Sequence, residues 1–104
     1  GSSFANARLA RARLSQSRFT SAALTGADFT SANLEKADFS RAQLDGAVLN
    51  HVAAGAAKFL HANLSGASLE NADLRGADLS GARLTKVNRA GAKLDGAKLT
   101  GTLE

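Results

Sequence analysis

A five-residue period runs through almost the whole of this chain of 104 residues. Counted from Phe4, every fifth residue is Leu or Phe at eighteen of twenty-one positions, and the residue two places earlier is small, most often Ala. On a helix these large residues would wind around the axis, and on a straight strand they would alternate between the two faces. The chain must therefore turn a corner once per unit, so that each large residue points toward one central axis.

Two further residue types recur in phase with this period. Asp or Asn directly precedes the large residue at Asp28, Asn33, Asp38, Asn63, Asp73, Asp78 and Asn88. Eight of the ten glycines stand two residues after the large residue. Because Gly, Asn and Asp accept a positive φ more readily than other residues, we expect them to form the corners.

The unit resembles the motif of the pentapeptide repeat family. It is matched by Ala27-Asp28-Phe29-Thr30-Ser31, Ala32-Asn33-Leu34-Glu35-Lys36, Ala72-Asp73-Leu74-Arg75-Gly76 and Ala77-Asp78-Leu79-Ser80-Gly81, and the resemblance extends over nearly the whole chain. It implies an all-β fold, a right-handed quadrilateral β-helix (a pentapeptide repeat solenoid) with four units in each coil. We expect a single domain over residues 1–104, with about five coils of about twenty residues forming a stiff rod about 25 Å long.

A coil of this length stacks residue n on residue n+20, and this stacking predicts the core. Phe19, Phe39 and Phe59 then form one column of rings along the axis. Leu34 and Leu74 belong to a second column of large residues. Such columns are typical of a packed core rather than of a cofactor site.

Besides the terminal Glu104, two residues break the pattern of large side chains. Ala54 stands where its column otherwise has Leu, so we expect a gap or a local bend there. This break is either a kink that shapes a contact surface or, as we favour, a tolerated repeat defect. Arg89 also takes a large-residue position, and we expect its side chain to leave through the open end of the last coil or to cap that end.

The sequence predicts no catalytic, metal or cofactor site. The chain has no Cys, which excludes disulfides, thiol chemistry and cysteine-ligated zinc. His51 and His61 are ten residues apart, hence on opposite sides of a four-sided coil, and cannot share a metal ion. None of the common hydrolase, nucleotide-binding or metalloprotease motifs occurs, and we expect a solid coil to lack a concave pocket. We therefore predict that the protein is not an enzyme.

The termini and the hydropathy indicate the origin and the location of the chain rather than its activity. Gly1-Ser2 and Leu103-Glu104 are typical of vector-derived residues, so we expect the chain to be an excised piece of a longer protein. No apolar run approaches the roughly 18 residues needed to cross a bilayer. We expect no membrane span and a cytoplasmic location for the chain as written.

Charge is unevenly placed along the chain, which carries a net +4 at pH 7. Residues 1–27 hold four arginines and no acid, residues 28–81 hold seven acids against four bases, and residues 82–104 hold five bases against two acids. The four arginines are candidates for contact with an anionic partner: Arg8, Arg11, Arg13 and Arg18. Equally, cationic ends can oppose end-to-end growth of a β structure, and this is the interpretation that we favour.

Opposite charges also alternate along one predicted column. Its members are Arg18, Asp38, Lys58, Asp78 and Lys98. Each neighbouring pair of opposite charges should contribute about 0.2–1 kcal/mol at most. This column therefore needs no ligand to explain it.

Three functions remain open, and the first is the one we favour. It is a noncatalytic scaffold or protein-interaction module within a larger protein, whose protein partner the sequence does not identify. The resemblance implies a second, a DNA mimic that binds DNA gyrase, although duplex DNA has about one negative charge per 1.7 Å and this chain is net positive. A third is weak binding of nucleic acid or another anionic surface by the four arginines, which we disfavour because every Phe is committed to the core. We also expect a weak homodimer that pairs one coil end of each copy.

Overall fold

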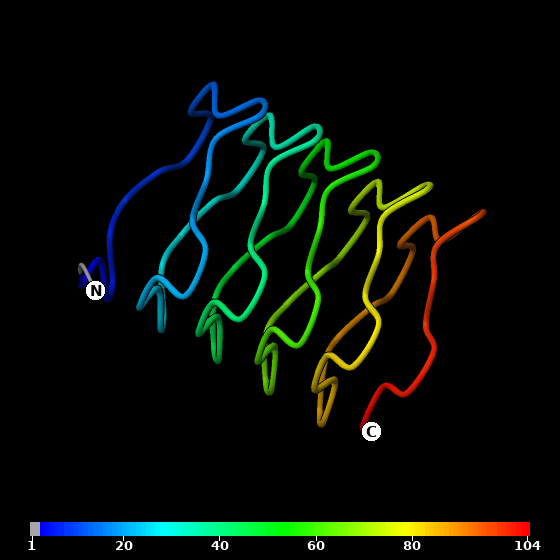
Figure 1. The fold of residues 1–104 in the computed structure, drawn as a ribbon. Helices are drawn as coiled ribbons and strands as arrows, with labels where there is room; N and C mark the ends of the chain where they lie inside the picture. The colour runs from blue at the N-terminus through cyan, green and yellow to red at the C-terminus, as the bar shows by residue number, and fades with distance from the viewer. Residues whose placement is uncertain (1–2) are drawn as a thin grey trace.

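A computed structural model describes residues 3–104 and shows the chain as a stack of coils, with the two ends of the chain at opposite ends of the stack (Figure 1). The molecule measures 28 × 22 × 22 Å. Its length is close to the expected value, but it is almost as wide as it is long. The fold is therefore a short prism.

Single-residue parallel bridges hold neighbouring coils together, and each bridge joins residue n to residue n+20. Within residues 3–104 the chain forms no helix and no strand longer than one bridged residue. The bridges follow four columns, which define four sides of the prism. Side A is Ser3-Ala23-Gln43-Asn63-Arg83-Leu103, side B is Arg8-Asp28-Val48-Ser68-Asn88, side C is Arg13-Asn33-Ala53-Asp73-Lys93, and side D is Arg18-Asp38-Lys58-Asp78-Lys98. The coil of twenty residues with four units is thereby confirmed.

Each corner is a β-turn with a positive φ at its third residue, as in type II turns. A representative corner is closed by the Ala37 amide, which donates to the Leu34 carbonyl at 3.0 Å, and Lys36 between them has φ of 59°. Glycine takes this position at eight corners, but twelve residues with positive φ are not glycine. They include Arg11, Lys36 and Ala56, which no turn rule singles out. The ladder hydrogen bonds on either side impose this conformation.

The Asp and Asn residues that precede the large residue do not form the corners as expected. They sit at the bridged positions, and each accepts a hydrogen bond from the amide of the residue two places on, such as Ser40 to Asp38 at 2.9 Å and Glu35 to Asn33 at 3.1 Å. Stacking pairs three of the other amides of such a unit with carbonyls of neighbouring coils, and the corner turn pairs the fourth. The side chain therefore satisfies the one donor that the stack leaves over.

The core is wholly apolar: every buried residue within 3–104 is hydrophobic. Phe39 stacks on Phe19 and Phe59 with ring centroids 5.0 Å and 5.2 Å apart, and Phe29 meets its edge at 5.6 Å. This confirms the predicted ring column, although Phe19 in the first coil is only partly buried. Leu34 and Leu74 are buried as predicted: the first is 0% exposed and the second 1%.

The coil that contains Ala54 keeps its regular backbone pairing, so of the two expected outcomes, a gap or a local bend, the bend was wrong. Ala53 bridges both Asn33 and Asp73, and the Ala54 amide donates to the Asp73 carbonyl at 2.8 Å as in other coils. Two residues earlier, Val52 stands where the pattern has Ala and is 1% exposed. We expect the extra volume of Val52 to offset part of what Ala54 lacks. The hydrogen bond that closes the adjacent turn, from the Val52 amide to the Leu49 carbonyl, is 3.5 Å long.

Candidate interaction surface

The four N-terminal arginines lie around the first coil rather than in one patch. Arg8, Arg13 and Arg18 occupy sides B, C and D, and Arg11 stands at the corner between sides B and C. All four are exposed. The ion pairs among residues 3–104 involve other side chains, so these arginines form a cationic collar that has no acidic partner within the described chain.

Side D carries alternating charges, and the bridges confirm that its members are neighbours. Hydrogen bonding from Ser40 lowers the pKa of Asp38, and the positive charges of Lys58 and Arg18 lower it further. Ser80, and then Lys98 and Lys58, lower the pKa of Asp78 in the same way. The charges on this side interact without a direct ion pair in the described part of the chain.

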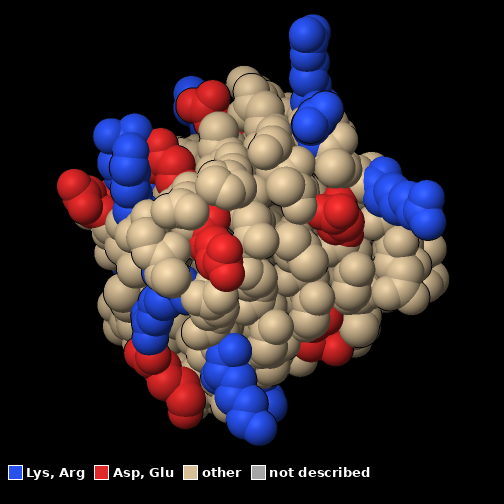
Figure 2. Space-filling view, turned by 180° about the vertical axis from the view of Figure 1, so that it is seen from behind, with Lys and Arg blue, Asp and Glu red and all other residues tan. Residues whose placement is uncertain are grey.

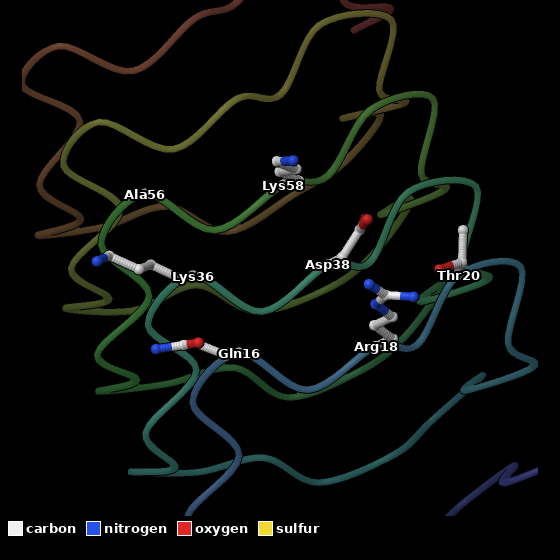
Figure 3. A pocket seen from close by; sticks show the side chains of 7 residues that line it. All are labelled: Gln16, Arg18, Thr20, Lys36, Asp38, Ala56 and Lys58. Carbon is white, nitrogen blue, oxygen red and sulfur yellow. The ribbon is translucent and has the colours of Figure 1, made fainter.

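A shallow groove runs across side D and its neighbouring corner, and Figure 3 shows its lining. Its volume is about 600 Å³, and its lining residues are Gln16, Arg18, Thr20, Lys36, Asp38, Ala56 and Lys58. The expectation that the coil has no concave surface was therefore wrong. The hollow forms because the short side chain of Ala56 follows Gln16 and Lys36 in the same corner column. The groove carries three cations and one acid, but Lys36 extends away from the other charges (Figure 3).

On side C, Arg75 and Asp73 form a two-point ion pair. The Arg75 guanidinium donates to both carboxylate oxygens of Asp73, at 2.9 Å and 2.7 Å. Together with the amide of Arg75, these bonds lower the pKa of Asp73 to about 2. This pair links two residues of one unit, so it stiffens a corner rather than opening a binding site.

A second ion pair lies at the C-terminal end of the prism, where Leu99 and Leu103 are 39% and 54% exposed. Arg89 and Glu104 both occupy large-residue positions, and their side chains pair with each other across this end. Below them lies a small apolar space of about 10 Å³ lined by leucines, Val87 and the Arg89 side chain. The prediction that Arg89 leaves through the open end and caps it is confirmed. Glu104 occupies the same position of the five-residue unit as Arg89 and has the opposite charge. This signal in the sequence could have revealed the pair.

The N-terminal end has no comparable cover among the described residues. Phe4 is 45% exposed, and Leu9 and Leu14 are only partly buried. In the next coil the amides of Asp28, Asn33 and Asp38 donate to carbonyls of the first coil. The equivalent amides of Arg8, Arg13 and Arg18 donate to no carbonyl within residues 3–104. Among the described residues this end combines apolar surface with positive charge.

The histidines behave as predicted, since His51 and His61 are both exposed. Across residues 3–104 no three His, Cys, Asp or Glu side chains come together as a metal site would require. A membrane-spanning helix is likewise absent from that part of the chain.

The fold is a solenoid of five-residue units around an apolar axis. The family model described as "Pentapeptide repeats" matches eight copies within residues 1–35, 12–50, 22–59 and 62–101. The chain belongs to the pentapeptide repeat family.

Solved structures of this family resemble the chain. A pentapeptide repeat protein from the thylakoid lumen of Arabidopsis thaliana has 27% identity and a TM-score of 0.67, over 97% of this chain and 63% of its own. HetL, involved in heterocyst differentiation regulation in the cyanobacterium Nostoc, has 32% identity and a TM-score of 0.46, over 97% of this chain and 59% of its own. QnrB1, a plasmid-mediated fluoroquinolone resistance protein, has 24% identity and a TM-score of 0.47, over 96% and 59%.

This chain therefore spans less than two thirds of the length of each of these three structures. No curated protein matches the chain in sequence.

Proposed function

We propose that this protein is a noncatalytic interaction module, a right-handed quadrilateral β-helix that presents side chains to a protein partner from within a larger, cytoplasmic protein. The observation that supports it most is the separation of roles within each unit. Every buried residue is apolar, and the coils are joined through backbone groups. The outward side chains are therefore free to vary for recognition without loss of the fold.

A gyrase-binding DNA mimic is the second candidate, and charge argues against it. Such a mimic needs a continuous acidic field, because DNA carries about one negative charge per 1.7 Å. Here the acids alternate with bases on side D. Figure 2 shows acidic and basic side chains interspersed over one face of the molecule.

Binding of nucleic acid through the arginines is the third candidate. Its support is the positive charge of the collar, which would attract phosphates. Against it stand the burial of Phe29, Phe39 and Phe59 and the spread of the arginines over three sides. Phe4 is 45% exposed, so the expectation that every Phe is committed to the core was wrong for this residue, and one ring stays open to base stacking.

Photo-cross-linking from opposite sides of the prism tests the proposed function. A photoreactive residue is placed at outward-facing Gln43 on side A or Asn33 on side C, and adducts are compared in cells that express the full-length protein. An interaction module should give discrete protein adducts from one side and few from the opposite side. Equal, diffuse labelling from both sides would contradict the proposal.

Two assays in solution separate the alternatives. We expect no retention of duplex DNA at about 150 mM salt, where weak phosphate binding is screened, and no change in gyrase supercoiling. DNA retention that falls steeply with salt would favour the nucleic-acid candidate. Protection of gyrase from an inhibitor would favour the DNA mimic.

A further inference from the structure

The charges of side D alternate from coil to coil. Along the stack they are positive, negative, positive, negative and positive, at Arg18, Asp38, Lys58, Asp78 and Lys98. Neighbouring coils lie about 4.8 Å apart, so the sign changes at every step of that length. Side D of a second copy has the same step, and its charges therefore stay in register with these over several coils.

Symmetry decides which arrangement of two D sides brings opposite charges together. If the coils of two copies ran in the same direction about a two-fold axis, each residue would face its own equivalent, and like charges would meet. With the coils running in opposite directions, full overlap also pairs like charges, since Arg18 would face Lys98. A shift by one coil makes every facing pair opposite. Arg18 then faces Asp78, Asp38 faces Lys58, and each pair occurs twice because the contact is symmetric.

The shift can go in either direction, and the groove beside Ala56 selects one of them. In the pairing just described, the corner between sides C and D meets the same corner of the second copy, with the order of coils reversed. Lys36, which extends away from the other charges (Figure 3), then lies opposite Ala56, where the corner is hollow. The opposite shift would leave Ala56 facing Gly76, and the hollow would stay empty.

The hollow also offers a negative charge to the incoming lysine. The Glu35 carboxylate reaches over Gly55 in the next coil, 4.0 Å from where a β-carbon of Gly55 would stand. Gly55 is the neighbour of Ala56, so Lys36 of one copy approaches Glu35 of the other. Shape and charge therefore select the same shift.

We propose that side D is a self-association surface, through which two copies of the protein pair as an antiparallel, two-fold dimer shifted by one coil. This goes beyond the proposed function, because side D then joins two modules and leaves sides A, B and C of each copy open to other proteins. Exposed charge pairs contribute little each, so the dimer forms at low salt and dissociates as salt screens the charges. Two joined modules bind a partner that has two sites more strongly than one module does.

Sedimentation at low salt and about pH 8, where histidine is neutral, tests this proposal. We expect the weight-average mass of the wild-type protein to rise with concentration toward twice that of the monomer, and to fall as salt is added. Lys58→Glu places a glutamate opposite Asp38, and we expect this variant to stay monomeric. Lys98→Glu is the matched control, because it makes the same change of charge in the coil that the shift leaves unpaired, and it should dimerise as the wild type does. A monomeric wild type at low salt, or the same behaviour of both variants, would overturn the proposal.

A mixture of two variants locates the contact. Asp38→Lys places a lysine opposite Lys58, and Lys58→Glu places a glutamate opposite Asp38, so neither variant should associate with itself. Mixed one to one, the two chains have opposite charges at every facing position, and we expect dimers to reappear. If both variants are folded by circular dichroism and their mixture stays monomeric, the assigned pairing is wrong.

Ala56→Lys is a further variant that leaves the charges of side D in place. It should fold, because Lys36 already takes the same corner conformation, with φ of 59°. It fills the hollow with a second positive charge, and we expect it to be monomeric at low salt. Gly96→Lys adds the same charge to the same corner outside the overlap and should still dimerise. Dimerisation of Ala56→Lys at wild-type strength would contradict the proposal.

Other contacts respond differently to these tests. Pairing of the two basic ends would strengthen with added salt and would survive Lys58→Glu, so it is separable from pairing through side D. The photo-cross-linking positions lie on sides A and C, so that experiment reports on the proposed function separately.

Discussion

At the scale of single residues, each unit divides its five side chains between the axis and the solvent. The large and small residues fill the axis, and a bridged Asp or Asn accepts the amide that the stack leaves free. At the corner, residues as different as Lys36 and Ala56 take a positive φ. The backbone therefore depends on a few positions per unit, and the others are open to change.

Phe39 is the residue on which the core depends most. Its ring stacks between Phe19 and Phe59 and meets the edge of Phe29, and it is 0% exposed. We expect Phe39→Ala to lower the free energy of unfolding by about 3–5 kcal/mol, because rings on both sides hold the cavity open. Chemical denaturation measures this loss. A change below about 1 kcal/mol would contradict the role of the ring column.

Stability should fall in acid because of the bridged aspartates. The pKa values of Asp28, Asp38 and Asp78 are lowered below the usual value of an aspartate, and that of Asp73 is lowered to about 2. A carboxylate whose pKa is lower in the folded state stabilises the fold above its unfolded pKa, and this contribution disappears as pH falls through the folded value.

We therefore expect the thermal unfolding midpoint to fall between about pH 4 and about pH 2, as followed by circular dichroism. Asp73→Asn is the matched control, because asparagine does not titrate but keeps an oxygen for the Arg75 amide. This variant should show a smaller fall over the same range. An unfolding midpoint that does not change with pH would show that these aspartates do not link folding to protonation.

At the scale of the coil, a larger side chain at one position can compensate for a smaller one at a nearby position. Val52 and Ala54 replace the usual Ala and Leu of one unit, and both are buried. The turn bond to Leu49 lengthens to 3.5 Å, against 2.8–3.1 Å at the turns that end in Ala. The pair thus behaves as one packing unit with a modest cost at its corner.

A double-mutant cycle tests this exchange. Val52→Ala alone should destabilise by creating a cavity, and Ala54→Leu alone should destabilise by overpacking against Val52. The double variant restores the common pattern, and we expect it to be at least as stable as the wild type, with a coupling of about 1–3 kcal/mol. Additive losses in chemical denaturation would show that the two sites do not share one space.

The period of the sequence was enough to predict the coil and its columns, but not its corners or ends. Phe19, Phe39 and Phe59 share a column because a twenty-residue spacing leaves them no other place. The role of Asp38 was missed because Asp suits both a positive-φ corner and an amide acceptor, and backbone pairing decides between them. The groove beside Ala56 was missed because it depends on side-chain length at one corner of three successive coils.

At the scale of the whole molecule, both ends are basic and repel each other. Added salt screens this repulsion while it leaves the apolar attraction of the exposed ends, so we expect the weak homodimer of the wild-type protein to become more populated as salt rises. Sedimentation at about 100 μM over a range of salt measures this. A strict monomer at every salt concentration would contradict end-to-end pairing.

Because each coil has four sides, a change of chain length by one unit also changes how the surface is arranged. One unit spans one side of the prism, so the gain or loss of five residues would turn every later side chain by a quarter revolution about the axis. We expect the core to accept the change, since Leu occurs in every column of large residues and Phe in three of the four. Outward side chains would gain new neighbours in the adjacent coil. After loss of one unit between residues 83 and 98, for example, Lys98 would stand over Asp73 instead of Asp78. Insertions and deletions of whole units thus rotate the later part of the surface relative to the earlier part, a change that substitutions alone cannot produce.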